Sequence, residues 1–570
     1  MRLIFRYVQP YLKRMTLGLV IKFLGTIMDL FLPYILAHII DNVVPLQDLS
    51  LVIRWGVIML VCSFLAILGN VIANRMAAWV ARETTRRLRH DLFRKISYLS
   101  NRQIDGFTVP SLISRMTTDT YNIHRMVGMM QRIGIRAPIL VVGGIAVTIS
   151  LDPVLALVLT CMLPIILGIV FVVSRRSVPL FDRLQKSVDV MVRVVRENAS
   201  GVRVIKALSR TEGEKSRFEG VNRQVMQDEN RANMVMAFSK PAMNLTLNLG
   251  LVLVILVGAR RVNSGLAGPG VITAFLTYFT IILNAMMSIT RVLTMWSKAL
   301  ASADRVEQVL ACPDELTPQD IPAVEEEAHL VFDKVNFSYD GKENNLEDIS
   351  FALKRGESLG IIGPTGAGKS TLAGLLMRFY DVTDGSIRVD GRDVRSYELK
   401  PLRDKFGVVF QNDILFKKSI GENIRIGRNL SMERVEQAAK DAQAAFFIEE
   451  TGGMEASLEA RGVNLSGGQK QRLLIARALA GRPDILILDD SSSALDYQTD
   501  ARLRQTVYRD YGDTTTVIIA QRVSSVKNCD RILVLEDGRM SGFGTHEELM
   551  QTCDLYREIS RLQMGEGAAE

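Results

Sequence analysis

Apolar and polar positions divide the chain into a membrane part and a soluble part. Six apolar stretches in the first half each supply about the 20 residues that a helix needs to cross a bilayer core. We therefore expect spanning helices at 15–40, 51–80, 127–150, 153–173, 241–262 and 271–295. The intervening segments 81–125 and 174–240 are compatible with helices, but they are rich in Arg and Lys and too polar for lipid. Because basic loops stay on the cytoplasmic side, both segments and both termini are predicted to be cytoplasmic, in a multi-pass protein of the cell membrane.

The second half changes to short β-type runs that alternate with helical stretches. These runs lie at 330–337, 358–362, 387–389, 407–410, 485–488, 516–519 and 531–535. The alternation predicts a soluble α/β domain. A segment rich in proline and acidic residues precedes it and has no apolar periodicity, which is typical of a linker. We predict a transmembrane domain at 1–310, a linker at 311–329, an α/β domain at 330–564 and a disordered tail at 565–570.

Composition narrows the class of protein further. The 570 residues are 48% hydrophobic, with a net charge of +8 and a mean hydropathy of +0.16. This combination favours a membrane protein with basic cytoplasmic loops over a nucleic-acid binder, which would show a basic stripe with aromatic residues interleaved. Five scattered cysteines without a Cys-x-x-Cys pair indicate free thiols, and the five histidines show no metal-ligand spacing. No small-residue cleavage site follows the first apolar run, so no cleaved signal peptide is expected.

A glycine-rich loop between a predicted strand and a helix carries the clearest chemistry. The residues that fit the pattern G-x-x-x-x-G-K-[ST] are Gly363, Pro364, Thr365, Gly366, Ala367, Gly368, Lys369 and Ser370. Thr371 follows them and is expected to contact the nucleotide as well. Glycines let backbone N–H groups wrap phosphates, and the helix N-terminus adds positive potential. Lys369 is expected to reach the β- and γ-phosphates and Ser370 to ligate magnesium.

A buried strand predicted at 485–488 ends in two carboxylates, Asp489 and Asp490. In doubly wound α/β folds the ligand binds at the carboxyl ends of the strands. Asp489 is therefore expected to hold Mg²⁺, and Asp490 to face the terminal phosphate of a nucleotide.

A second anion site is predicted in the same domain. It consists of Leu465, Ser466, Gly467, Gly468 and Gln469. These residues precede a predicted helix that contains Arg472 and Arg477, and their backbone amides would lie at the N-terminus of that helix. One domain cannot aim both sites at one nucleotide. The domain resembles the nucleotide-binding domain of the ATP-binding cassette (ABC) family, in which ATP lies between the phosphate loop of one cassette and the LSGGQ signature of another.

The resemblance extends over practically the whole chain and implies an exporter half-transporter that uses ATP and Mg²⁺. Tyr339 resembles the aromatic residue that stacks on adenine, and Gln411 the glutamine that contacts magnesium. The residues 493–496, which end in Asp496, match the loop through which two cassettes touch. By the same resemblance, segments near 108–116 and 205–209 would be coupling helices that dock on the cassettes.

Two residues depart from the family pattern. Asp490 stands where the family has a glutamate, and Gln521 where it has a histidine. A general base must come within about 2.6–3.2 Å of the attacking water, and aspartate reaches less far. An amide can hydrogen-bond a phosphate oxygen but cannot carry a proton or a positive charge. We expect a slow, degenerate site here, an intact signature that completes the site of a non-identical partner, and hence a heterodimer. The alternative is a homodimer in which both changes are harmless.

The membrane part gives fewer clues to a substrate. Asp29 lies mid-span between Lys22 and His38, and is either a contact for a cationic or amphipathic substrate or a carboxyl bonded to a neighbouring helix. Other candidates that could line a cavity or simply pack are Asn244, Asn248, Asn284, Met286, Met287 and Met295. We expect an exporter of amphipathic drugs, lipids or peptides in contact with membrane lipids. A cassette that regulates a membrane partner without pumping is the alternative, whereas the six spans exclude a soluble cassette acting on nucleic acid.

Overall fold

The computed structural model describes the chain except for residues 412, 492–493 and 565–570. The predicted disordered tail therefore lies outside the described residues. The chain forms two compact units. One unit comprises Met1–Ser97 with Pro110–Ala311, and the other Tyr98–Val109 with Cys312–Glu570.

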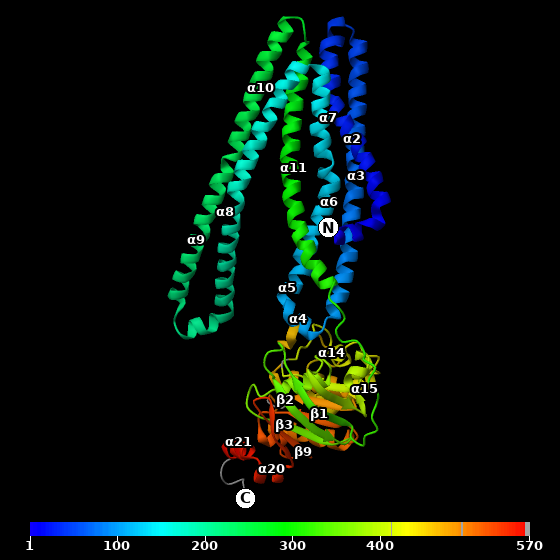
Figure 1. Ribbon diagram of the computed structural model, residues 1–570, viewed down its shortest axis with the longest axis vertical. Helices are drawn as coiled ribbons and strands as arrows, with labels where there is room; N and C mark the ends of the chain where they lie inside the picture. The colour runs from blue at the N-terminus through cyan, green and yellow to red at the C-terminus, as the bar shows by residue number, and fades with distance from the viewer. Residues whose placement is uncertain (412, 492–493, 565–570) are drawn as a thin grey trace. The chain divides into compact units, whose positions relative to one another are not determined.

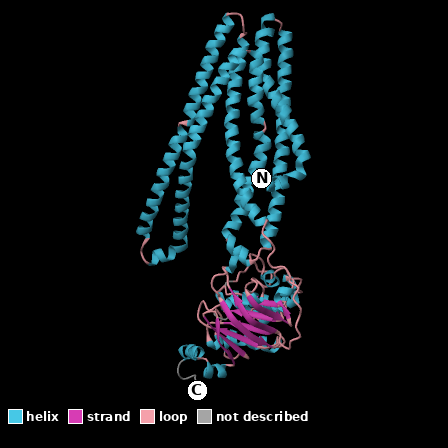
Figure 2. Ribbon diagram, in the orientation of Figure 1, coloured by secondary structure: helices cyan, strands magenta, loops and turns pink. Residues whose placement is uncertain are grey.

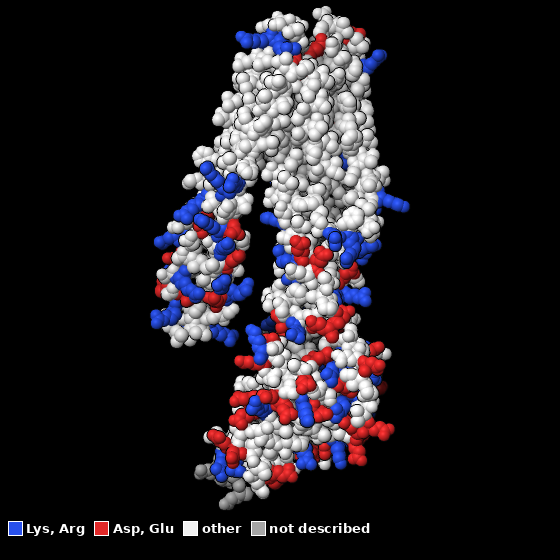
Figure 3. Space-filling view, in the orientation of Figure 1, with Lys and Arg blue, Asp and Glu red and all other residues white. Residues whose placement is uncertain are grey.

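The first unit is helical (Figures 1 and 2). In chain order its helical elements are α1 (Arg2–Val8), η1 (Gln9–Tyr11), α2 (Leu12–His38), η2 (Ile39–Val43), η3 (Val44–Leu46), α3 (Leu49–Ser97), α5 (Val109–Ser114), η4 (Arg115–Asp119), α6 (Thr120–Met129), η5 (Met130–Gly134), α7 (Arg136–Leu151), α8 (Pro153–Ala207), α9 (Thr211–Ala237), α10 (Ser239–Asn263) and α11 (Pro269–Leu310). These elements contain six candidate membrane spans by length and composition, as the sequence predicted. Figure 3 shows a band free of Lys, Arg, Asp and Glu across these helices, and dense charge on the α8–α9 hairpin.

Local signals explain where the longest helix begins. Asp152 caps α8, because its Oδ1 accepts hydrogen bonds from the backbone N–H of Val154 (2.9 Å) and Leu155 (3.1 Å). Pro153 follows at the first helical position, where a missing N–H costs nothing. The other carboxylate oxygen of Asp152 accepts from Nε of Arg261 in α10 at 2.6 Å, so this ion pair links the start of α8 to α10.

The apolar core of this unit is built mainly from α2, α7, α8, α10 and α11. It includes the fully buried aromatic side chains Phe275, Tyr278 and Phe279 of α11. The hydroxyl of Tyr278 donates to the backbone carbonyl of Leu30 in α2. The α8–α9 hairpin, in contrast, projects from the other helices of the unit (Figure 1) and leaves Val192, Val204 and Met234 exposed.

The second unit holds the α/β fold, with two sheets. A six-stranded sheet has the order β10-β9-β3-β8-β7-β6, and a four-stranded antiparallel sheet has the order β2-β1-β4-β5. The strands are β1 (Leu330–Phe337), β2 (Leu346–Leu353), β3 (Ser358–Ile362), β4 (Asp384–Val389), β5 (Arg392–Asp393), β6 (Phe406–Val409), β7 (Ile485–Asp489), β8 (Thr515–Ile519), β9 (Arg531–Glu536) and β10 (Arg539–Gly544). β9, β3, β8, β7 and β6 pair in parallel, so their carboxyl ends share one edge.

Helices cover the sheets of this unit. They are α4 (Asn101–Phe107), α12 (Lys369–Leu376), η6 (Val394–Ser396), α13 (Leu399–Asp404), α14 (Ile420–Arg425), α15 (Met432–Asp441), α16 (Ala445–Glu450), η7 (Ala460–Gly462), α17 (Gly467–Leu479), α18 (Tyr497–Asp510), α19 (Val523–Val526), α20 (His546–Thr552) and α21 (Asp554–Met564). The observed architecture confirms the predicted class: a six-span helical domain fused to an α/β nucleotide-binding domain. Strands β2, β5 and β10 had no counterpart in the prediction.

Candidate functional site

Four neighbouring strands of the parallel sheet deliver the predicted nucleotide-site residues to one edge. The phosphate loop follows β3, Gln521 follows β8, Asp489 ends β7, and Gln411 follows β6. They surround a cavity of about 340 Å³. Its lining residues are Tyr339, Asn345, Thr365, Gly366, Gly368, Lys369, Ser370, Thr371, Gln411, Asp489, Asp490, Ile519, Ala520 and Gln521. Gly363, Pro364 and Ala367 complete the loop without lining the cavity.

The loop conformation depends on its glycines. Gly366 and Gly368 have φ angles of +90° and +95°, which L side chains rarely adopt. A Cβ on Gly368 would also lie 2.6 Å from Cδ2 of Leu346. Gly368 is the N-cap of α12, so Lys369 opens that helix. The Lys369 ammonium donates to the carbonyls of Gly363 and Pro364, both at 2.7 Å, and so lies across the loop where phosphates would bind.

Burial shapes the charges in this cavity. Asp489 is 5% exposed. Burial raises the pKa of its carboxyl, while a hydrogen bond from the Ser370 hydroxyl opposes that rise. Burial lowers the pKa of Lys369, and the carboxylates of Asp489 and Asp490 act in the opposite direction. A basic group and two acids therefore share a partly desolvated space, an arrangement typical of a site for a charged ligand.

The three predicted metal ligands supply only oxygen donors. These are the Ser370 hydroxyl, the Asp489 carboxylate and the Gln411 side-chain carbonyl, and all three line the cavity. Nε2 of Gln411 donates to Oδ2 of Asp490 at 3.4 Å, which leaves the carbonyl oxygen of that amide available. Hard oxygen donors with few protein ligands suit Mg²⁺ that also binds phosphate oxygens.

Asp490 and Gln521, the two departures from the family pattern, both line this one cavity. The backbone at Asp490 has φ +49°, and its N–H donates to the carbonyl of Ile519 at 2.8 Å. The Gln521 carbonyl accepts a hydrogen bond from Nε2 of Gln563 in α21 at 2.8 Å. The side-chain oxygen of the same Gln563 accepts from the N–H of Val523, so α21 braces the segment that carries Gln521.

Tyr339 lies at the rim of the cavity and is 42% exposed. Its hydroxyl lies 3.1 Å from Oγ1 of Thr371. Asn345 escaped the sequence analysis, although it lines the cavity and its Oδ1 accepts from the N–H of Tyr339 at 3.0 Å. No motif flags Asn345, because only the turn before β2 brings it beside the tyrosine.

The signature residues form a separate surface of the same unit. Ser466 caps α17 and accepts from the N–H of Gln469 at 3.3 Å, while Oε1 of Gln469 accepts from the Ser466 N–H at 2.9 Å. This capping box leaves Ser466 and Gly467 exposed, whereas Leu465 is buried. Among the described residues, none of 465–469 lines the nucleotide cavity.

The predicted cassette-contact loop borders this surface. A Cβ on Gly468 would lie 3.1 Å from the carbonyl of Ala494. Asp496 caps α18, since its carboxylate accepts from the N–H and the hydroxyl of Thr499 at 2.9 and 2.7 Å. Ser493 lies outside the described residues.

A short segment from the N-terminal half belongs to the cassette unit. It is Tyr98–Val109, which contains α4. The hydroxyl of Tyr380 donates to Asp105 at 2.8 Å, Nε2 of Gln103 donates to the carbonyl of Pro313 at 2.9 Å, and the Ser100 hydroxyl donates to Glu315. The segment in contact with the cassette thus begins about ten residues before the predicted 108–116.

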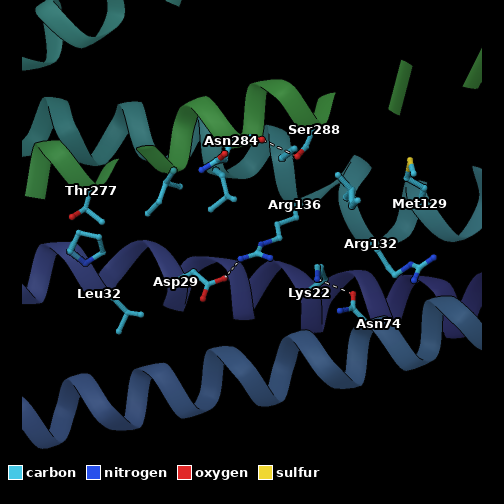
Figure 4. A pocket seen from close by; sticks show the side chains of 16 residues that line it. Lys22, Asp29, Leu32, Asn74, Met129, Arg132, Arg136, Thr277, Asn284 and Ser288 are labelled. Carbon is cyan, nitrogen blue, oxygen red and sulfur yellow. Dashed lines mark hydrogen bonds and ion pairs between the residues drawn. The ribbon is translucent and has the colours of Figure 1, made fainter. Parts of the chain in front are cut away.

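The helical unit contains a second cavity, of about 750 Å³ (Figure 4). Asp29 and Asn284, for which the sequence left a cavity position and helix packing both open, line it, and so does Lys22. The other predicted candidates are not among the described residues that line it: Asn244, Asn248, Met286, Met287 and Met295. The sequence analysis missed its other charged residues, Arg132 and Arg136, although their spacing of four at the start of an apolar stretch is visible in the sequence.

Comparison with known proteins agrees with this arrangement. The family model described as ABC transporter transmembrane region matches residues 15–286, and the one described as ABC transporter matches residues 346–493. An uncharacterised ABC transporter ATP-binding protein of Mycobacterium tuberculosis (strain CDC 1551 / Oshkosh) is 34% identical over 98% of this chain and 97% of that protein. The chain belongs to the ABC transporter family. Like other ABC transporters it combines a membrane region with an ATPase domain, which implies ATP hydrolysis coupled to transport.

Two further relatives of this ABC transporter cover nearly its whole length. The uncharacterised ABC transporter ATP-binding protein YfiB of Bacillus subtilis (strain 168) is 33% identical over 99% of both chains. The structure of a bacterial Atm1-family ABC exporter with ATP bound superposes with a TM-score of 0.81 at 25% identity, covering 97% of this chain and 99% of that one. The exporter type of ABC fold is thereby established.

Proposed function

We propose that this chain is one half of an ATP-driven exporter and works with a second, non-identical half-transporter. The main support for this proposal is the separation of the two anion sites. The phosphate loop lines the cavity, while the exposed signature residues Ser466 and Gly467 lie outside it. A nucleotide held by the loop leaves this signature available to a nucleotide held by another cassette.

Within its own cavity the chain holds and orients the nucleotide. Tyr339 stacks on the base, the amides of 363–369 and the ammonium of Lys369 bind the phosphates, and Asp489, Ser370 and Gln411 hold Mg²⁺. Bound Mg²⁺ neutralises charge on the phosphate oxygens. Asp490 orients the attacking water with a carboxylate one methylene shorter than the family's glutamate, and Gln521 hydrogen-bonds the terminal phosphate without positive charge. Hydrolysis at this site is slow.

The partner's site is the faster one. Its nucleotide meets the intact signature of this chain, and its own residues supply the glutamate and the histidine that this chain lacks. Two features support a partner: the exposed apolar residues of the α8–α9 hairpin, and the exposed capping-box serine. Closure of the two cassettes moves α4 through its contacts with Tyr380 and Pro313, and hydrolysis at the partner's site resets the transporter.

ATPase measurements on two assemblies test this proposal. The full-length chain is purified alone and with its partner half-transporter, both in the cell-membrane lipid of the host. We expect ATP turnover by the pair to exceed that of the chain alone by about a hundredfold, the cost of a poorly placed catalytic group. Equal turnover would overturn the heterodimer and favour the homodimer with harmless substitutions.

Transport distinguishes a pump from a regulator. Proteoliposomes that contain the pair should accumulate an amphipathic probe against its gradient when ATP is added. ATP turnover without movement of any amphipathic molecule, lipid or peptide would favour the alternative, a cassette that gates a membrane partner.

A further inference from the structure

The cavity of the helical unit has an unusual charge for a site inside membrane-spanning helices. Its lining includes Lys22 of α2, Arg132 of η5, Arg136 of α7 and one carboxylate, Asp29 of α2. Three positive charges less one negative charge leave an excess of two. An ionisable side chain at membrane depth is unfavourable unless it finds water or a partner. The excess therefore calls for a counter-ion from outside the chain.

The single carboxylate is already occupied. Oδ2 of Asp29 accepts from NH2 of Arg136 at 2.9 Å (Figure 4). It also accepts from Nδ2 of Asn70 in α3 at 3.2 Å. Asp29 thus ties α2 to α3 and α7, which is the second of the two roles predicted for it. A cationic substrate would have to displace Arg136 from this carboxylate.

The hydrogen bonds of the remaining two cations to described residues go to neutral groups. The Lys22 ammonium donates to Oδ1 of Asn74 at 3.0 Å, and its side chain is only 2% exposed. Nε of Arg132 donates to the carbonyl of Gly128 in α6 at 3.0 Å, and Arg132 is an exposed residue that lines the cavity. Nε of Arg136 is buried without a hydrogen-bond partner in the described part of the chain. Cationic donors that lack an anionic hydrogen-bond partner bind carboxylate, sulfonate or phosphate oxygens.

Two of the three cations, Arg132 and Lys22, lie toward one end of the cavity, with Met129 beside Arg132, whereas Asp29 and Arg136 lie between the ends. In Figure 4, Asn74 lies with these two cations, and Leu32 and Thr277 lie toward the other end. The remaining walls are mostly apolar: Pro33, Met129, Ile133, Ala137, Leu140, Ile281 and Ala285. A volume of about 750 Å³ is typical of a pocket for one drug-sized molecule.

We infer that the substrate of this transporter is an amphipathic anion. Its acidic head lies among Lys22, Arg132 and Arg136, and its apolar body lies along Leu140 and Ile281. This assignment rests on the proposed export function and names the chemical class that the exporter carries. It replaces the cationic substrate considered from the sequence.

Three probes with one apolar body and different heads test the inference. They are dansyl-aminoundecanoate, its methyl ester and its trimethylammonium analogue. Their binding to the full-length chain with its partner half-transporter is measured in detergent without ATP, and their ATP-driven uptake is measured in proteoliposomes. We expect the anion to bind about tenfold more tightly than the ester, the value of one charge-assisted contact. Equal or tighter binding of the ester or the cation would overturn the inference.

Substitutions in the cavity test where the acidic head group of the anion binds. Arg132→Gln should weaken binding of the anion about tenfold and leave binding of the ester unchanged. Arg125→Gln is the matched control, because Arg125 lies seven residues earlier, is exposed and does not line the cavity. If Arg132→Gln does not fold, Lys22→Gln and Lys22→Arg are used instead. Lys22→Gln should then lose the preference for the anionic probe over the ester, and Lys22→Arg should keep it. Loss of affinity for the ester and the anion alike would contradict a role in recognising charge.

The remaining outcomes separate the two proposals and the two sources of anion. Selective binding of the anion without ATP-driven uptake of any probe would sustain this inference and contradict export. Uptake of the cation but not the anion would sustain export and overturn this inference. Labelled phosphatidylglycerol, compared with labelled phosphatidylcholine, tests a lipid headgroup. If only phosphatidylglycerol is preferred, and the preference depends on Arg132, the anion is a lipid headgroup. If dansyl-aminoundecanoate is preferred in the same way, the anion is a soluble molecule.

Discussion

Nε2 of Gln411 and Oδ2 of Asp490 lie 3.4 Å apart, at the carboxyl ends of two adjacent parallel strands. The contact spans the space where the metal and the terminal phosphate of ATP are expected. It also shows that the shorter Asp490 carboxylate still reaches an amide across the cavity.

Restoring the family residues should accelerate this site. Asp490→Glu combined with Gln521→His is expected to raise the single-turnover rate of ATP hydrolysis at this cavity by up to about a hundredfold, since the base reaches the water and the switch residue can carry charge. The same methylene added at the exposed Asp513 (Asp513→Glu) is the control. An unchanged rate in the double variant would show that neither departure limits hydrolysis.

The signature should serve a nucleotide other than the one in the chain's own cavity. Ser466→Arg places a bulky cation at the exposed start of α17 and should lower ATP turnover of the pair about 10²–10³-fold, the cost of losing aligned donors at a phosphate. Nucleotide binding by the phosphate loop of this chain should persist, as measured with a fluorescent ATP analogue. Ser431→Arg alters the N-cap of α15 in the same way and serves as the control. Loss of binding at both sites would contradict the separation.

Tyr380 links α4 to the nucleotide site. Its hydroxyl donates to Asp105, and its ring packs edge-to-face on Tyr339 with 5.1 Å between ring centroids. Tyr380→Phe keeps the ring and removes the hydrogen bond, at a cost of about 0.5–1.5 kcal/mol. We expect fewer substrate molecules moved per ATP hydrolysed, with nucleotide affinity retained. Tyr397→Phe, which removes a hydroxyl bonded to the carbonyl of Val389, should leave that ratio unchanged.

The balance of charge in the membrane cavity can be changed in the opposite direction. Asp29→Asn removes its one lining carboxylate and releases Arg136. The anionic dansyl probe should then bind about tenfold more tightly, with the ester unaffected. Asp48→Asn, at an exposed position, is the control. Weaker binding of the anion would mean that Arg136 needs Asp29 to hold it in place.

A buried histidine makes stability depend on pH. Burial lowers the pKa of His329 below its ordinary 6.5, the nearby Arg355 lowers it further, and Asp390 acts in the opposite direction. As pH falls below about 6.5, the unfolded chain binds a proton that the folded cassette does not. The free energy of unfolding should therefore fall by up to about 1.4 kcal/mol per pH unit from this group. Unfolding curves of wild type and His329→Gln between pH 7.5 and about 5 check this: the difference in stability between them should change with pH, and a constant difference would contradict it.

Motifs and long apolar runs were predictable because they depend on local sequence. Lys369 and Asp489 meet at one edge because parallel strands place their carboxyl ends together, so strand order alone brings them close. Strand β10 was missed because half of Arg539–Gly544 is exposed and the segment contains two glycines, which removes the apolar alternation of a strand. The membrane cavity could not be predicted, because Lys22, Asn74 and Arg132 come from separate helical elements whose relative rotation depends on packing.

The grouping of Tyr98–Val109 with the cassette affects how the soluble half behaves when separated from the rest. A fragment that begins at residue 312 would lose the twelve residues that cover Pro313, Glu315 and Tyr380. Those groups would face solvent in the fragment, and the edge-to-face pair of Tyr380 and Tyr339 would lose its support from Asp105. Nucleotide affinities measured on such a fragment would thus describe a cassette in which the ring pair of Tyr339 and Tyr380 is no longer held by residues 98–109.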